Sequence, residues 1–180
     1  GLAIALGSAG GIAGGLRSLV SYASLNATRG QYYQQHQFAD VFVSLKRAPR
    51  HLLQQVAEIP GVTRLSGRVE GGAKLEVAGF QDPVSAHLVS VPETGQPDVN
   101  QLYLRQGRLP DASRTDEVTI IGSFADAHNL QLDDQLTAII NGRRQTLTIV
   151  GIAESPEFIY VIPPGGMLPD YQRFGVLWMS

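Results

Sequence analysis

Side chains that could bind a metal are scattered along this sequence. The four histidines are His36, His51, His87 and His128, and no two of them have the spacing of metal ligands. Asp126 and His128 precede Asp133–Asp134, a grouping that would form a site only if the intervening turn folded back. The polar face of a short helix and its turn explains these residues better, so we expect no metal site.

Carboxylates and hydroxyls give no clear catalytic arrangement either. Asp116–Glu117 and Glu154–Glu157 are carboxylate pairs of the kind that general acid–base catalysis uses, but we interpret them as solvated turns before and after strands. Ser66 and Ser123 lack the flanking glycines of a nucleophile elbow. The sequence contains no cysteine, which excludes disulfides, thiol nucleophiles and thiolate metal ligands. We therefore expect no catalytic residues and no enzyme activity.

The segment Gly7–Gly15 is the strongest candidate for a cofactor site. An apolar run followed by clustered glycines resembles the turn through which dinucleotide-binding proteins approach a pyrophosphate. The spacing is not G-x-G-x-x-G, and hairpin patterns follow it instead of repeated strand–helix–strand units. A soluble nucleotide-binding oxidoreductase that uses Gly7–Gly15 is therefore the alternative hypothesis, and our main interpretation has no cofactor site in this chain.

Residues 1–16 carry no charge and favour a membrane helix. As a helix they would extend roughly 24 Å, short of the roughly 30 Å hydrocarbon core, so we expect upstream residues to complete the span. Gly7, Gly11 and Gly15 fall four residues apart, a spacing that lets another helix pack closely in lipid. In water, each glycine inside a helix would cost about 1 kcal/mol relative to alanine.

Beyond Arg17 the pattern becomes amphipathic. Apolar residues repeat at helical spacing, and a polar stretch over 31–37 follows them. We interpret residues 16–37 as a helix that leaves the bilayer and forms a stalk. The chain then divides into residues 1–37, the end of a first transmembrane helix with its stalk, and residues 38–180, an extracytoplasmic domain. The apolar positions of the stalk are Leu16, Leu19, Val20, Ala23 and Ala27.

Residues 38–180 have the pattern of an α+β domain with a mixed sheet and two short helices. The helices are expected over 49–59 and from Ser123 to about Asn129, with Asp126 completing a capping-box-like start. Gly71–Gly72 and Asn141–Gly142 are expected as hairpin turns. Residues 101–109 are mixed in character. Strands are expected at 40–45, 62–69, 73–80, 84–91, 117–121, 136–140, 145–152, 158–162 and 174–179.

The overall composition limits the class of partner. The chain has 180 residues, of which 43% are apolar, enough for one domain with a core. Its formal net charge is −2, with acidic and basic residues interspersed. Nucleic-acid binding needs a basic patch, so we expect no nucleic-acid partner.

Short motifs follow one another in a characteristic order along residues 38–180. In order and spacing they resemble the outer domain of ABC-transporter permeases of the FtsX/MacB type, and the resemblance covers nearly the whole chain. Asp133–Asp134 stands where that family usually has Gly-Asp, so a turn of another type is expected there. The motifs are Phe38–Phe42, Leu45–Pro49, Ile59–Val62, Leu104–Pro110, Glu117–Val118, Phe124–Ala125 with Leu130 and Asp134, Asn141–Arg143, Ile149–Ile152, Ser155–Tyr160, Leu168–Asp170 and Phe174–Met179.

The resemblance implies a permease subunit in the bacterial inner membrane, with residues 38–180 on the periplasmic side. ATP would be bound by a partner ABC ATPase, not by this chain. The other implied partners are a second permease copy or a homologous permease half, membrane lipid, and a periplasmic or lipoprotein partner. In such permeases the stalk transmits ATP-driven helix motion to the outer domain, which then acts on the exported or extracted substrate. The transported substrate does not follow from the sequence.

Overall fold

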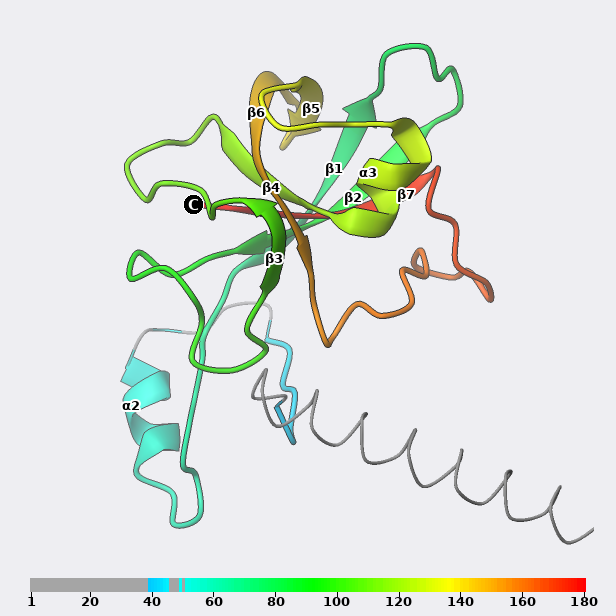
Figure 1. Cartoon of the computed structure of the whole chain (residues 1–180). Coiled ribbons are helices and arrows are strands. Elements are labelled where there is room, and N and C mark those ends of the chain that lie inside the picture. Colours follow the sequence, from blue (N-terminus) through cyan, green and yellow to red (C-terminus); the bar gives the residue numbers. More distant parts are fainter. Residues whose placement is uncertain (1–38, 46–48, 50) are drawn as a thin grey trace, which may run out of the picture. The chain divides into compact units, whose positions relative to one another are not determined.

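The computed structural model describes residues 39–45, 49 and 51–180 (Figure 1). The expected membrane helix and stalk over 1–37 and the Gly7–Gly15 segment lie outside the described residues. Within the described ranges, no helix is long and apolar enough to cross a bilayer. The two short helices and the mixed sheet expected for 38–180 are present.

Two short helices and seven strands make up the described part of the chain. The helices are α2 (His51–Ala57) and α3 (Gly122–His128). The strands are β1 (Glu70–Glu76), β2 (Val84–Ser90), β3 (Tyr103–Gly107), β4 (Glu117–Ile121), β5 (Gln135–Ile140), β6 (Arg143–Glu154) and β7 (Phe174–Met179).

The strand pairings close on themselves through β6. Its first half pairs antiparallel with β5, and its second half pairs with β4 on one side and β3 on the other. The described strands therefore form a ring in the order β6, β4, β7, β2, β1 and β5. Strand β3 lies outside this ring and pairs with β6. The β2–β7 and β4–β6 pairs are parallel, and the other pairs are antiparallel. The sheet is mixed, as expected, but its closure was not predicted.

The core is built from the alternating faces of these strands. In β1 and β2, the buried Ala73 and Leu75 lie opposite Ala86 and Val84. In contrast, β4 is buried at every position because α3 packs against it as well. Phe124 of α3 is 0% exposed. Burial of such an aromatic side chain contributes about 2–3 kcal/mol.

The end of α3 was predicted correctly, but its start was not. Asn129 ends the helix in the left-handed region with φ of 54°, and its N–H points to the carbonyls of Ala125 and Asp126. At the other end, Ile121 occupies the N-cap position without a side-chain hydrogen bond. The buried Ser123 Oγ has no hydrogen-bond partner in the described part of the chain. The capping box is therefore wrong, because α3 begins at Gly122, directly after β4, and Ser123 lies inside its first turn.

The two predicted glycine turns have opposite outcomes. Asn141 and Gly142 have φ of 50° and 77° and connect β5 to β6, so this hairpin is confirmed. Gly71–Gly72 lies inside β1, where it pairs with Leu88 and His87 of β2, so a hairpin there is wrong. Glycine permits a turn but does not force one, and here the pairing with β2 decides the backbone conformation.

Three expected strands are absent from the sheet. Residues 40–45, 62–69 and 158–162 are irregular, and Val41 and Val43 are each 75% exposed. β-branched residues favour extended backbone, but a strand also needs a free sheet edge. In the ring, β7 is already paired on both sides with β2 and β4, which leaves no place beside it for 158–162. The first helix is confirmed, although α2 is shorter than the expected 49–59.

Gly151 of β6 pairs with Gly107 of β3 on one side and with Thr119 of β4 on the other, and the close packing at this position can be tested. A Cβ on Gly151 would lie 2.2 Å from the Arg108 carbonyl oxygen and 2.8 Å from Thr119 Oγ1. Gly151→Ala should therefore lower the free energy of unfolding by about 2–3 kcal/mol in urea denaturation. The matched control is Gly71→Ala, because a Cβ there meets nothing within 4 Å. Equal losses of stability in the two variants would contradict the close packing around Gly151.

Candidate functional site

The histidines within the described residues lie on different elements and form no cluster. His51 lies on α2, and His87 lies on β2 with its Nε2 3.4 Å from Glu70. His128 packs against the rings of Phe80 and Phe124, and its Nε2 lies 2.8 Å from the Gln172 carbonyl oxygen. No cluster of three metal-ligating side chains occurs among the residues that the structure describes.

The acidic residues near His128 are engaged elsewhere. Asp126 accepts hydrogen bonds from Arg105. Asp134 accepts the N–H of Gln131 at 2.8 Å, which closes the turn before β5. Asp133 has φ of 69°, the backbone conformation that a glycine would accommodate. Aspartate therefore adopts the left-handed conformation at Asp133, and the expectation of another type of turn at Asp133–Asp134 stays a prediction.

Glu117 is not the solvated turn residue that its sequence context suggested. Its side chain is 6% exposed, whereas that of the neighbouring Asp116 is 51% exposed. Strand β4 begins at Glu117, and the carboxylate lies under the loop that connects β3 to β4. Glu154 and Glu157 also separate: Glu154 pairs with Arg105 and Glu157 with Arg68. Neither carboxylate pair forms a two-carboxylate site.

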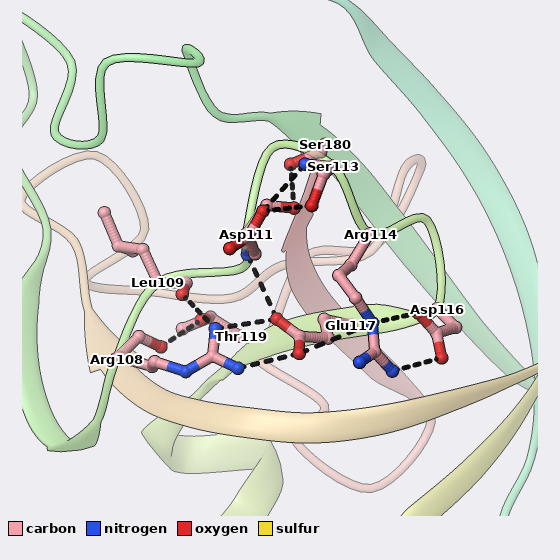
Figure 2. A network of polar contacts seen from close by, with 9 residues as sticks. All are labelled: Arg108, Leu109, Asp111, Ser113, Arg114, Asp116, Glu117, Thr119 and Ser180. Atoms are coloured by element: carbon pink, nitrogen blue, oxygen red, sulfur yellow. Dashed lines mark hydrogen bonds and ion pairs between the residues drawn. The ribbon is translucent and has the colours of Figure 1, made fainter.

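Arg108 and Asp111 hold the Glu117 carboxylate from two directions (Figure 2). The Arg108 guanidinium donates two hydrogen bonds of 2.7 Å, one to each carboxylate oxygen. The Asp111 N–H donates a third to Oε2 at 3.0 Å. Such a two-point contact fixes orientation as well as distance. It therefore fixes the position of the 108–111 segment over β4.

The neighbouring backbone prepares this contact. Gly107 has φ of 72°, and a Cβ there would lie 2.2 Å from the Val150 carbonyl oxygen. This turn presents the Arg108 carbonyl to Thr119 Oγ1, which donates at 3.0 Å (Figure 2). Further along, Ser180 Oγ donates to the Asp111 carbonyl oxygen at 3.1 Å. Arg108 and Glu117 each belong to a motif recognised in the sequence, but the contact between them was not predicted.

The charges in this cluster shift one another's titration. Hydrogen bonding from Arg108, and then from the Asp111 N–H, holds the pKa of Glu117 below its ordinary value. The same contact raises the pKa of Arg108. The hydrogen bonds from Arg114 lower the pKa of Asp116 in the same way. The cluster is therefore fully ionised at neutral pH, and it orders a loop without offering a proton donor or acceptor near pH 7.

A second ion-pair cluster links β3, α3 and β6. Arg105 Nη1 donates to Asp126 at 2.9 Å and to Glu154 at 3.2 Å. Gly122 lies beside it, because a Cβ there would meet Glu154 Oε1 at 2.2 Å and Arg105 Nη1 at 2.3 Å. The guanidinium and the two carboxylates are each more than a third exposed, so this cluster contributes little stability.

The loop between β6 and β7 carries the two most exposed large apolar side chains among the described residues. Residues 158–169 contain no charged residue. Met167 is 93% exposed and Leu168 is 77% exposed. Val161 of the same loop is buried, and the Gly166 N–H donates a hydrogen bond to the Pro163 carbonyl oxygen in a turn. We call residues 158–169 the apolar loop.

Two open hollows accompany these features. One, of about 830 Å³, lies over β1 and β2, and Gly71, Gly72, His87, Pro164 and Phe174 are among its lining residues. The other, of about 700 Å³, lies beside α2. Both are wide and shallow, unlike the enclosed pockets that bury most of a small ligand.

Comparison with solved structures finds two similar extracytoplasmic domains. The first is the extracellular domain of the noncanonic ABC-type transporter YknZ from Gram-positive bacteria, with a TM-score of 0.47 and 11% identity. The match covers 81% of this chain and 70% of that domain. The second is the periplasmic region of MacB from Actinobacillus actinomycetemcomitans, with a TM-score of 0.44 and 14% identity. It covers 76% of this chain and 56% of that region.

Comparisons of sequence give no match. Neither a family model nor a curated protein is similar to this chain.

Glu117→Gln tests the buried ion pair. The amide keeps the shape of the side chain but loses the charge that binds Arg108, so we expect a loss of about 2 kcal/mol in the free energy of unfolding. The control is Asp116→Asn, which removes an ion pair that is half exposed on both sides, so we expect a clearly smaller loss. Urea denaturation of both variants measures the difference. Equal losses would show that burial of Glu117 has no energetic consequence.

The pH dependence of this pair follows from the lowered pKa of Glu117. A group whose pKa is lower in the folded state stabilises the fold above its unfolded value, here about 4.5, and loses that contribution as pH falls further. The stability difference between the parent chain and Glu117→Gln should therefore be constant from pH 7 to about pH 5 and shrink below about pH 4.5. Urea denaturation at a series of pH values measures it. A difference that stays constant down to pH 3 would contradict this origin.

Proposed function

We propose that this chain is the end of a first transmembrane helix and the extracytoplasmic domain of an ABC-transporter permease of the FtsX/MacB type. In this proposal residues 16–37 form a stalk that moves when a partner ATPase hydrolyses ATP. The domain couples that movement to export or extraction of a substrate. Localisation in the bacterial inner membrane and pairing with a second permease copy or homologous half belong to the same proposal.

One observation carries the proposal: separate motifs of the resemblance meet in a single contact. Leu104–Pro110 contains Arg108, and the next motif begins with Glu117. The two side chains form the two-point ion pair that fixes the β3–β4 loop. The Ile149–Ile152 motif contributes Gly151, whose missing side chain leaves room for the Arg108 carbonyl. Motifs that depend on one another in this way support a shared outer-domain design more strongly than isolated matches do.

The turn before β5 adds support. The family usually has Gly-Asp where this chain has Asp133–Asp134. Asp133 adopts φ of 69°, and Asp134 accepts the Gln131 N–H. The turn therefore keeps the backbone conformation that the family's glycine favours, although the residue differs.

The exposed side chains favour a domain that acts on another macromolecule. The apolar loop presents Met167 and Leu168 almost completely to solvent. Exposed apolar groups that gather in one segment are typical of interaction sites. In the proposed permease, a periplasmic or lipoprotein partner would contact this loop, and membrane lipid would surround the first helix.

No described feature favours the alternative oxidoreductase. A dinucleotide-binding domain needs successive parallel strands joined by helices after its glycine turn. The described strands are mostly antiparallel, and consecutive strands such as β1 with β2 and β5 with β6 form hairpins.

Insertion of a flexible Gly/Ser block near Asn26 tests the coupling. A rigid helix transmits displacement along its axis, whereas a flexible linker does not. In the assembled transporter, we expect ATP hydrolysis to continue while export falls to the level of an ATPase-inactive complex. An insertion of equal length in the Asn141–Gly142 hairpin turn is the control. Unchanged export with the stalk insertion would contradict the proposed role of residues 16–37.

Expression of residues 38–180 alone separates the permease from the oxidoreductase. In the permease interpretation the ring of strands contains its own core, so this fragment should show a cooperative urea transition and native-like circular dichroism. A dinucleotide-binding domain would lose its first strand and glycine turn and would not fold. An unfolded fragment would therefore contradict the division of the chain at residues 37 and 38.

A further inference from the structure

Asn100 connects two segments that lie far apart in the sequence. Its Oδ1 accepts a hydrogen bond from the Ala39 N–H at 2.9 Å. Its Nδ2 donates to Glu157 Oε2 at 3.1 Å. Asn100 is 5% exposed, and both contacts are partly buried. The single side chain therefore bridges the start of the domain and the root of the apolar loop.

The backbone around Asn100 is held in one conformation. Asn100 has φ of 55°, a region that asparagine tolerates better than most residues. Two residues later, Leu102 exchanges hydrogen bonds with the Gln96 side chain, with its N–H donating and its carbonyl accepting, each at 2.9 Å. Leu102 is buried in the core. The backbone that follows Asn100 is therefore held by the Gln96 side chain and by the burial of Leu102.

Glu157 is fixed from its other side by Arg68. Arg68 Nη1 donates to Glu157 Oε2 at 2.6 Å, and Nη2 donates to Oε1. Arg68 Nε donates to Glu70 Oε1 at 2.7 Å, which ties the guanidinium to β1. The side chains of Arg68 and Glu157 are 25% and 16% exposed, so solvent and salt screen this pair less than the surface pairs. Hydrogen bonding to Glu157 raises the pKa of Arg68.

Glu157 lies immediately before the apolar loop. The next residue, Phe158, donates its N–H to the Ser155 carbonyl oxygen at 3.2 Å. Its ring lies 6.1 Å from that of Trp178 on β7 and 5.8 Å from that of His87 on β2. Glu157 is therefore the direct chain neighbour of the residue whose ring contacts β7 and β2.

We propose that Asn100 is a relay that transmits displacement of the chain at Ala39 to the root of the apolar loop through Glu157. The inference deepens the proposed function, since it names the contact by which stalk movement would reach the loop. The contacts themselves do not depend on that function. The relay is defined by Ala39, Asn100, Glu157 and Arg68.

Ala39→Pro tests transmission from the start of the domain. Proline removes the N–H that binds Asn100 and leaves Glu157 unchanged. If the relay operates, the Phe158 N–H should exchange with solvent about tenfold faster, the effect expected when one buried hydrogen bond is lost from a coupled network. Leu45→Pro is the control, because no hydrogen bond of the Leu45 N–H occurs within the described ranges. Hydrogen exchange by NMR on the whole chain measures both variants, and equal Phe158 rates in the two would overturn the relay.

Asn100→Asp tests the central residue with little change in shape. The substitution keeps an acceptor for the Ala39 N–H but places a carboxylate against Glu157, so the Phe158 N–H should again exchange about tenfold faster.

Asn141→Asp is the matched control for the central residue. Asn141 has φ of 50° and lies in the β5–β6 turn. Its substitution therefore makes the same chemical change at a backbone conformation close to that of Asn100. It should leave Phe158 exchange unchanged. Circular dichroism confirms that each variant is folded. Equal Phe158 exchange rates in the folded Asn100→Asp and Asn141→Asp variants would overturn the relay.

These measurements need no ATPase and no export assay. A negative exchange result would overturn the relay and leave the permease proposal standing. Conversely, failure of the stalk insertion to uncouple export would contradict the permease proposal, while the hydrogen-exchange coupling between Ala39 and Phe158 would still be measurable.

Discussion

The described structure depends on one strand pairing with different partners along its length. The twelve residues of β6 pair first with β5 and then with β4 and β3, and this change of partner closes the ring. Register shifts occur between Val118 and Thr119 and between Leu104 and Gln106, close to the point where β6 leaves β5. Such irregularities bend a strand and increase its twist, as ring closure requires. Gly151 lies at this point, where no side chain would fit.

The ion pairs are placed where loops return to the ring. Arg108 with Glu117 fixes the β3–β4 loop, and Arg68 with Glu157 fixes the start of the β6–β7 loop. Both pairs have a carboxylate that is largely buried and a guanidinium that binds it at two points. The more exposed pairs, such as Arg114 with Asp116, contribute less because water competes for both charges. Charge in this domain therefore orders loops, and apolar burial holds the strands together.

Local sequence predicted the elements whose conformation is decided locally. Asn141–Gly142 forms its hairpin because both residues tolerate positive φ, and Asn129 ends α3 for the same reason. Strands β4 and β7 occupy the predicted 117–121 and 174–179. In contrast, Gly71–Gly72 was assigned wrongly because long-range pairing with β2 decides its backbone. Residues 40–45 were assigned wrongly because composition does not show whether a sheet edge is free.

The candidate site was harder to predict than the fold. Asp116 and Glu117 are adjacent acids in sequence, but alternation along β4 turns only Glu117 toward Arg108. The Gly107–Arg108 pair was visible as a motif, whereas Asn100 had no distinguishing signal in its loop. Its role depends on contacts with residues 61 and 57 positions away, and no local pattern encodes such contacts. The first thirty-eight residues, on which the membrane prediction rests, lie outside the described structure.

The position of β7 has a consequence for mechanical load. This strand pairs in parallel with β2 over six consecutive positions, from Phe174 opposite Ser85 to Met179 opposite Ser90. A pull along β7 would shear all of these hydrogen bonds together, whereas a pull across a hairpin would unzip them one after another. Shear shares the force among many bonds, so this ladder would yield only at a much higher tension. Tension applied along β7 would therefore be borne by all six pairs of the β2–β7 ladder before the two strands separate.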